Sequence, residues 1–380
     1  MRTHRSKEDG FTIIELLVVV SIIALLIGIL VPALGRARDS ALQSTSLSNL
    51  RQISIGLVSY AGDWADRQPT MIPDDFCQAT GGNSVRRCED YITNFHCLPQ
   101  PILGWANNGG YRELWGYFIT HNGRCSSVGG CHNIDAALPY EAEDKAGFWR
   151  MMNLKLFSQY MNDRFYDEVF YAPKDRRKRE KIEEFFDLPD EFNSDVTAQN
   201  EQIIEWPSYC MAASAMLSPD VTSGRRCNPQ DPTLPPECAD QMCDPCDFPG
   251  GYRSPSVGSA TYPDLKMRCW EHEWLQNNPA ELNPAFNTET PYFFNHSPQS
   301  APATLMFDGS VRIFSANEAI QSNQRVVNQG GCELWINDWS SVGPDGNYFE
   351  GASHGFVEER TSFGVLTRDG IKGRDTIGRE

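Results

Sequence analysis

Glu15 is the residue whose type and setting most clearly point to chemistry, because it is the only ionisable side chain in an apolar run over residues 11–31. As a helix that rises about 1.5 Å per residue, this run spans roughly the 30 Å hydrocarbon core of a bilayer. A charged carboxylate costs on the order of 2.5 kcal/mol or more at the centre of such a segment and less near the interface. Another group must therefore compensate for Glu15, which makes this residue a functional candidate.

Two ordinary interpretations of this segment fit poorly. A secretory signal peptide has a shorter apolar region that ends at a small-residue cleavage site, whereas this run continues into Val31-Pro32-Ala33. A simple membrane anchor accounts for the length of the run, but not for Glu15 or for the Gly10-Phe11 junction in front of it. The junction and the carboxylate need an explanation of their own.

The junction resembles the N-terminal signature of type IV pilins and type II secretion pseudopilins, since the chain reads Gly10-Phe11-Thr12-Ile13-Ile14-Glu15. The resemblance implies that a prepilin peptidase cuts between Gly10 and Phe11 on the cytoplasmic side and methylates the new amino terminus. It also implies that Glu15 neutralises the amine of a neighbouring subunit during assembly on an inner-membrane platform. Removing one partner of a buried ion pair costs about 3–5 kcal/mol, so such a pair acts as a registry device.

Basic residues in front of the apolar run set the expected orientation. Arg2, Arg5 and Lys7 place the leader in the cytoplasm and everything after the run outside it. We therefore expect a single-pass inner-membrane protein with an extracytoplasmic C-terminal domain, which later enters a periplasmic or surface filament.

The cysteine content agrees with an exported domain, because cytosolic proteins rarely keep many disulfides. The 12 cysteines would allow up to six bridges, whose pairing the sequence does not determine. They are Cys77, Cys88, Cys97, Cys125, Cys131, Cys210, Cys227, Cys238, Cys243, Cys246, Cys269 and Cys332. A zinc site at Cys238, Cys243 and Cys246, with Cys227 or Cys269, is the alternative, but these spacings do not form paired knuckles. Disulfides fit the segment better.

The chain is strongly acidic, with a formal net charge of −17. Removal of residues 1–10, which carry one more positive than negative charge, would leave it more acidic still. Phosphate binding depends on Lys and Arg, so the bulk charge argues against nucleic acid as a partner. It indicates a soluble, mutually repelling surface instead.

The apolar run is predicted to continue as one helix as far as Gly62-Asp63, with a kink at Pro32. Beyond the proline, apolar residues recur at three- and four-residue steps, while Asn49, Arg51 and Gln52 face elsewhere. The recurring residues are Leu47, Leu50, Ile53, Leu57 and Tyr60. By the resemblance, this one-sided second half lies against a sheet.

The clearest strand signal is a pair of apolar runs, residues 304–307 and 310–314, separated by Asp308-Gly309. This pattern predicts a hairpin with a two-residue primed turn. The hairpin resembles the end of a bacterial prepilin-type family marked by a histidine followed by Asp-Gly, and His296 would be that histidine. Other fragments similar to this family precede it in the same order: Asn49-Leu50-Arg51-Gln52-Ile53, Tyr171-Ala172-Pro173-Lys174-Asp175 and Pro207-Ser208-Tyr209.

The middle of the chain has weaker patterns. Residues 70–139 are interpreted as disulfide-stapled loops with short strands, and residues 141–166 as a helix. The charge run over residues 174–186 predicts a solvated helix face. Residues 227–263 are interpreted as a loop or insertion.

Near the C-terminus, residues 341–347 look like the Gly-Pro-Asp-Gly loop of major pseudopilins, where a calcium ion is held. The resemblance implies Asp345 and Asn347 as ligands together with backbone carbonyls, and hard oxygen donors suit calcium. An ordinary Pro-Asp-Gly turn is the alternative interpretation. No other cofactor is expected. The sequence has no Gly-x-Ser-x-Gly elbow, His-Glu-x-x-His pair or phosphate loop, and the turn already explains Asp308, so an enzyme is not predicted.

These patterns predict an α+β, pilin-like fold: a long N-terminal helix, transmembrane in its first half, packed on an antiparallel sheet with disulfide-rich loop insertions. The expected divisions are a leader at residues 1–10, the helix at 11–62 and an extracytoplasmic globular domain at 63–380. The predicted function is a structural subunit of a type II secretion pseudopilus or a type IV pilus-like filament, with other pilin subunits as partners. The competing hypothesis is a membrane-anchored module that binds glycan or protein without polymerising, and an exported hydrolase comes third.

Overall fold

A computed structural model describes residues 13–70, 104–108, 111–115, 152, 155–164, 166–175, 179–180, 182–187, 207–223, 250–251, 253–271, 301–336, 364 and 366–378. The chain forms two compact units, Met1–Thr45 and Ser46–Glu380.

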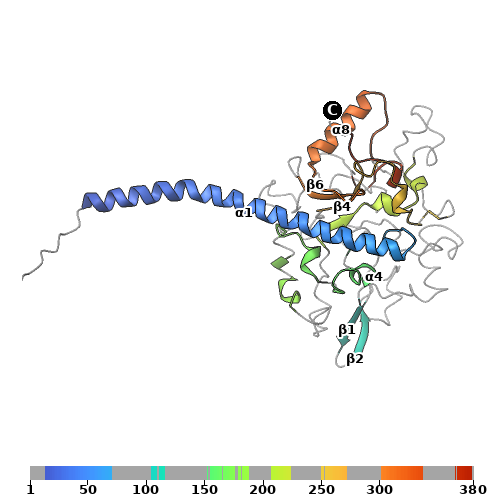
Figure 1. Cartoon of the computed structure of the whole chain (residues 1–380), viewed down its shortest axis with the longest axis horizontal. Coiled ribbons are helices and arrows are strands. Elements are labelled where there is room, and N and C mark those ends of the chain that lie inside the picture. The colour runs from blue at the N-terminus through green and yellow to red at the C-terminus, as the bar shows by residue number, and fades with distance from the viewer. Residues whose placement is uncertain are drawn as a thin grey trace, which may run out of the picture. The chain divides into compact units, whose positions relative to one another are not determined.

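Helix α1 covers Ile13–Asp63, a continuous length of 51 residues that includes Pro32 (Figure 1). The helix therefore continues past the proline and ends where the sequence predicted; the kink stays a prediction. Its end is fixed by a reversal of the chain, in which Asp66 adopts a positive φ of 61° and donates its N–H to the carbonyl of Ala61 at 2.7 Å. Such a bond satisfies one of the carbonyls that a helix leaves open at its C-terminus.

A four-stranded antiparallel sheet forms the centre of the second unit, with strand order β3-β4-β5-β6. The strands are β3 (Tyr209–Met211), β4 (Met267–Glu271), β5 (Ala303–Met306) and β6 (Val311–Ile313). A separate antiparallel pair, β1 (Gly104–Asn108) and β2 (Tyr111–Trp115), confirms the short strands expected in this part of the chain. Every residue of β3, β4 and β5 is buried, whereas β6 at the sheet edge is half-buried.

Short helices connect and flank these strands. They are α4 (Lys155–Ser158), η2 (Glu168–Phe170), η3 (Glu183–Phe185), η4 (Ala213–Met216), η5 (Pro219–Thr222), η8 (Val257–Ser259), α8 (Ala316–Asn328) and η11 (Gly370–Lys372). The longest, α8, was not predicted. Its start is nevertheless encoded locally, because the Ser315 side chain accepts the N–H of Glu318 at 3.1 Å, as an N-cap does.

Of the helix predicted over residues 141–166, the described residues confirm only one turn, α4 (Lys155–Ser158), and the rest of the described part is not helical. Helix α4 ends at Ser158, and Asp163 has a positive φ of 53°. The carbonyl of Ser158 accepts N–H groups from Met161 and Asp163, which closes a turn instead of another helical repeat. Met152 and Phe157 are both buried in the core of this unit, and Phe157 belongs to α4.

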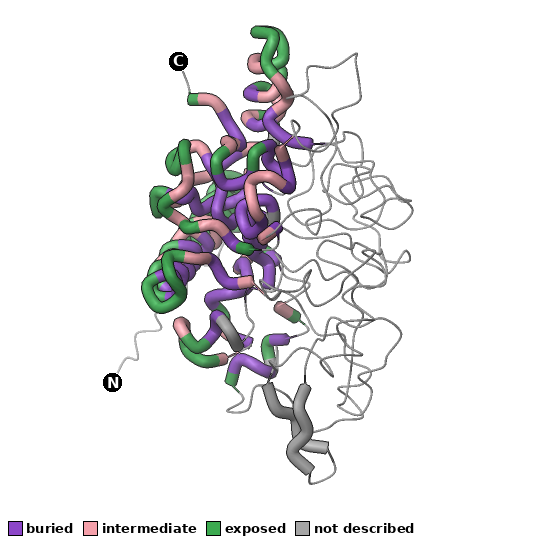
Figure 2. The backbone as a smooth tube through the Cα atoms, turned by 90° about the vertical axis from the view of Figure 1, so that its right-hand side faces the viewer, coloured by how far each residue is buried: buried purple, intermediate pink, exposed green. Residues whose placement is uncertain are grey.

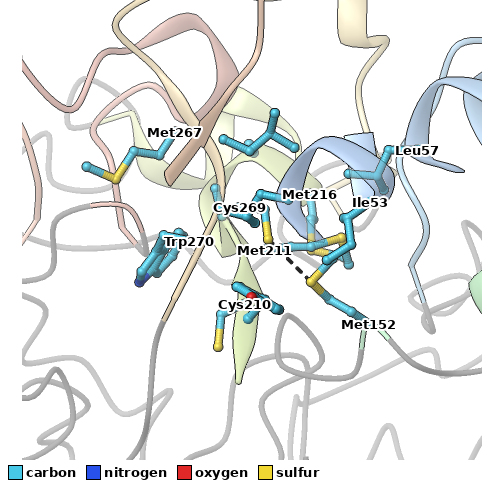
Figure 3. Packing of buried hydrophobic residues seen from close by; sticks show 14 of the residues in the cluster. Ile53, Leu57, Met152, Cys210, Met211, Met216, Met267, Cys269 and Trp270 are labelled. Atoms are coloured by element: carbon cyan, nitrogen blue, oxygen red, sulfur yellow. Dashed lines mark hydrogen bonds between the residues drawn. The ribbon is translucent and has the colours of Figure 1, made fainter. Parts of the chain in front are cut away.

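The core lies between the second half of α1 and the sheet. Leu50, Ile53 and Leu57 have no exposed surface and Tyr60 is nearly as buried, which confirms the predicted stripe. Figure 2 shows the buried residues of this unit gathered together. In Figure 3, Ile53 and Leu57 of α1 lie beside sulfur-containing side chains from β3, β4 and η4. The architecture is α+β and pilin-like, as predicted.

Candidate membrane-anchoring and assembly site

The first part of α1 presents apolar side chains on all its sides. Residues 13–41 are all exposed, although apolar side chains dominate up to Leu34. The exposed fractions of the large apolar side chains lie between 46 % at Val19 and 82 % at Ile13. By length and composition, this helix contains a stretch able to cross a membrane.

Polar groups in this stretch are few and are accommodated by the helix. Glu15 lies in the first turn and is exposed. A carboxylate there interacts favourably with the positive end of the helix dipole. The hydroxyl of Ser21 donates to the carbonyl of Val18 at 2.7 Å, so it needs no partner from outside the helix.

Most of the other predicted site residues lie outside the described residues. These are Gly10 and Phe11 at the processing junction, His296 of the motif, and Asp345 and Asn347 of the calcium loop. Glu15, Asp308 and Gly309 are the ones that the structure places.

Asp308 and Gly309 form the turn between β5 and β6, as predicted, but the type of turn differs. Gly309 has φ +83°, whereas Asp308 is not among the described residues with positive φ. The N–H of Gly309 bonds to the carbonyl of Met306 at 3.1 Å, and Met306 in turn bonds to Ser310. This is a three-residue loop that ends in a left-handed glycine, and not a primed two-residue turn.

The role of Asp308 in this loop is structural. Its Oδ1 accepts the N–H of Ser310 at 2.9 Å, and its own N–H bonds to the carbonyl of Pro263 at 3.0 Å. A catalytic role would require a carboxylate that is not already used to hold the loop, so these bonds favour the turn interpretation.

A buried polar cluster fixes the second half of α1, and sequence reasoning missed it. Asn49 was expected to face away from the core, but it is only 8 % exposed. Its Nδ2 donates to the hydroxyl of Tyr209 at 3.3 Å and contacts the carbonyl of Glu168 at 3.5 Å. The Tyr209 hydroxyl donates to Ser46 Oγ at 3.1 Å. Burial raises the pKa of Tyr209, and the charge of Glu271 adds to the effect.

The three family-like fragments therefore meet in space. Asn49 comes from α1 and Tyr209 from β3, while Ser208 links the fragment at Tyr171–Asp175 to the same place. Ser208 Oγ donates to Asp175 Oδ2 at 2.6 Å, and its N–H bonds to the carbonyl of Phe170 at 3.0 Å. Fragments far apart in the sequence thus build one docking surface for the helix.

Arg268 on β4 makes a second link between the helix and the sheet. It is 2 % exposed, its Nε donates to Gln68 Oε1 at 3.3 Å, and its Nη2 reaches the carbonyl of Leu57 at 3.5 Å. Its guanidinium carbon lies 5.6 Å from the centroid of the Phe307 ring, a cation–π distance. Burial lowers the pKa of Arg268 to about 10, although the charge of Asp66 opposes the shift.

The cysteines are only partly as expected. Cys332 is disulfide-bonded, but Cys210 and Cys269 are buried thiols, so six bridges cannot form. Cys269 Sγ lies 3.4 Å from Met152 Sδ in the core (Figure 3). Burial raises the pKa of the Cys269 thiol well above its usual range, which keeps it protonated and unreactive. The other cysteines lie outside the described residues, and the disulfide-rich insertions stay a prediction.

Comparison with known proteins bears on the N-terminus. Residues 5–31 match the family model of the prokaryotic N-terminal methylation motif. No curated protein and no solved structure matches the chain. The chain therefore carries a prokaryotic N-terminal methylation motif, followed by a long apolar helix. Together with the helix-on-sheet architecture, this supports a pilin-type protein that is processed by prepilin peptidase and anchored in a membrane.

Proposed function

We propose that this protein is a structural subunit of a pilus-like or pseudopilus-like filament. In this proposal, prepilin peptidase removes residues 1–10, the protein waits in the inner membrane, and subunits then polymerise through the first part of α1. The leader lies in the cytoplasm and the domain that begins after α1 lies on the other side of the membrane. The work is mechanical, and no enzymatic step is involved.

The observation that carries the proposal is the methylation motif on a helix with two kinds of surface. The motif covers residues 5–31 and α1 extends to Asp63. The part up to Ala41 is exposed on all sides, which suits lipid first and neighbouring helices later. The part from Ser46 is buried along one side by its own domain.

Glu15 supplies the pairing chemistry in this proposal. Cleavage after Gly10 creates a charged amine at Phe11, four residues before Glu15. In an apolar filament core, an unpaired carboxylate or amine is costly, whereas the two together neutralise each other. A subunit is then held best in the register that brings its Glu15 to the amine of a neighbour.

The proposal is tested first at the amino terminus. Mass spectrometry of the protein from its native membrane should find N-methylated Phe11 as the first residue. Gly10→Ala should retain the leader, because the peptidase requires the glycine at the cleavage point. A native chain that keeps Met1 to Gly10 would instead favour an anchored binding module that does not polymerise.

Assembly is tested separately with Glu15→Ala. We expect normal processing and normal recovery in membranes, with loss of filaments in electron micrographs. Ser21→Ala is the matched control, since it changes another polar residue of the same exposed run. Filaments of normal number and length from Glu15→Ala would refute the pairing role.

For the calcium loop, we propose that Asp345 and Asn347 bind one calcium ion that stabilises the C-terminal region. Thermal unfolding should then occur at a higher temperature with calcium than with chelator. Asp345→Ala should abolish this difference, and an equal response of the variant and the native chain would contradict the site.

A further inference from the structure

Lys266 and Asp375 form an ion pair inside the globular unit. Lys266 Nζ lies 2.9 Å from Asp375 Oδ2, and neither side chain has any exposed surface. Lys266 immediately precedes β4, while Asp375 belongs to the C-terminal segment after η11. Burying two charges is costly, and their attraction offsets this cost only in good geometry.

Both oxygens of the Asp375 carboxylate are held by donors. Oδ1 accepts the N–H of Gly364 at 3.0 Å and the hydroxyl of Thr367. Oδ2 accepts the N–H of Met267 at 2.8 Å in addition to Lys266 Nζ. The backbone is fixed as well, because the N–H of Asp375 bonds to the carbonyl of Leu265 at 2.9 Å. The carboxyl carbon is therefore immobilised beside the amine.

Thr367 connects the two partners. Its hydroxyl oxygen accepts a hydrogen bond from Lys266 Nζ while the hydroxyl donates to Asp375 Oδ1. The hydroxyl therefore bridges the amine and Oδ1, while Lys266 Nζ itself lies 2.9 Å from Oδ2 and can pass protons to that oxygen directly. Burial lowers the pKa of Lys266, against the opposing effect of the Asp375 charge, which favours transfer toward the neutral amine.

We propose that Lys266 and Asp375 are a self-reacting pair that forms an intramolecular amide bond between Lys266 Nζ and Asp375 Cγ. The neutral amine attacks Cγ, and the bond from Cγ to Oδ2 breaks. The ammonium form of Lys266 carries three protons: one stays on the amide nitrogen and two leave with Oδ2 as water. The reaction therefore balances without an oxidant, a nucleotide or any other co-reactant.

The donors around Asp375 fit this step. The oxygen that gains negative charge during attack is Oδ1, and it already faces Gly364 N–H and the Thr367 hydroxyl. Donors near 2.7–3.1 Å from a developing oxyanion are the arrangement that stabilises acyl-transfer intermediates. Holding amine and carboxyl in contact also removes most of the entropic barrier of a bimolecular condensation. Gly364 has φ +76°, which orients its N–H in a way that other residues rarely adopt.

The bond would join the start of β4 to the C-terminal segment. The residues just before η11 also reach the rest of the fold through hydrogen bonds, such as those between Asp369 and Thr222 and between Arg368 and Leu334. A covalent link at Asp375 would keep residues 366–378 in place when load or local unfolding opens these bonds. This inference is independent of the proposed filament, since it needs only the folded globular unit.

Mass spectrometry of the intact, full-length protein decides the question. We expect a mass lower than that of the encoded chain by one water molecule, after correction for processing, methylation and disulfides. Trypsin should release a branched peptide in which residues 254–268 are linked to residues 375–379. An unbranched set of peptides, with Lys266 cleaved normally, would overturn the proposal.

Variants separate the reaction from the simple ion pair. Lys266→Met should show the full encoded mass and no branched peptide. Asp375→Asn should still react but lose ammonia instead of water, so that the link forms with the same branched peptide. Thr367→Val should slow the appearance of the link in freshly refolded protein by tenfold or more. If a variant fails to fold, the mass of the native chain still gives the answer.

Discussion

The two parts of α1 differ in what surrounds them, although they belong to one continuous helix. Up to Ala41 every residue is exposed, and the side chains are mostly apolar up to Leu34. From Ser46 the helix has one buried side, which ends in defined hydrogen bonds to β3 and β4. The second part is therefore stabilised by its own chain. The first part has no such cover among the described residues, which agrees with the lipid and filament surroundings that we propose for it.

The largest effect is expected from a substitution on the buried side of the second part of α1. Leu57→Ala removes a fully buried side chain and should lower the free energy of unfolding by about 2–5 kcal/mol, because it leaves a cavity. Ile55→Ala is the control, since Ile55 is 69 % exposed on the same helix. It should change stability by only about 0.5 kcal/mol. Thermal unfolding of the full chain in detergent measures both, and equal losses would contradict the assignment of faces.

A charged substitution in the first part of α1 tests whether the apolar run inserts into a membrane. Ile23→Lys places an ammonium within the apolar run and should weaken membrane insertion by about 2.5–3.5 kcal/mol. The same change at Ile55, which is also exposed, should leave insertion unchanged. Alkaline extraction of membranes reports the fraction that remains inserted. If Ile23→Lys stayed fully in the membrane fraction, the apolar run would not be the anchor.

Tyr209→Phe tests how much the buried polar cluster of Ser46, Asn49 and Tyr209 stabilises the second part of α1 against the sheet. Removal of the hydroxyl leaves Asn49 and Ser46 without this partner and should cost about 1–3 kcal/mol. Tyr262→Phe is the control, because Tyr262 is 40 % exposed. Chemical denaturation of the two variants and the native chain compares the losses.

Tyr209 also predicts how the stability of the folded state depends on pH. Burial raises the pKa of Tyr209, so the folded state favours the neutral phenol. The neutral phenol of Tyr209 contributes fully to the free energy of unfolding below a pH of about 10, where tyrosine in the unfolded chain is also neutral. This contribution falls as the pH rises further. Tyr209→Phe should therefore lose less stability than the native chain above that pH. Identical alkaline profiles would show that the hydroxyl does not matter there.

The smallest effect is expected at the β5–β6 loop. Gly309→Ala should cost about 1–2 kcal/mol, because alanine is strained at φ +83°. Space is not the obstacle, since an added Cβ would meet only Ser54 Oγ at 3.9 Å. Gly62→Ala, within α1, is the matched control and should stabilise by about 0.5–1 kcal/mol. A shift of the same sign in both variants would contradict the backbone argument.

Local patterns predicted the elements whose signal is short-range. The apolar run, its periodic continuation and the Asp308-Gly309 turn were recognisable because a few neighbouring residues determine each. Asn49 was placed on the wrong side since its burial depends on Tyr209, which is distant in sequence. Arg268, Lys266 and Asp375 were missed for the same reason: a charged side chain predicts exposure unless its partners are known. The Ser315 cap of α8 was available in the sequence but was not used.

The triad of Ser46, Asn49 and Tyr209 has a further consequence for a helix that is pulled along its axis. A slip of one turn would bring Leu50 and Ile53 to the positions of Ser46 and Asn49. The phenol would then face only hydrocarbon, at a cost of about 1–3 kcal/mol for its stranded hydroxyl. Under tension the helix should therefore keep its axial position relative to the sheet up to a threshold force. It should then detach in one step, without populating positions shifted by one turn.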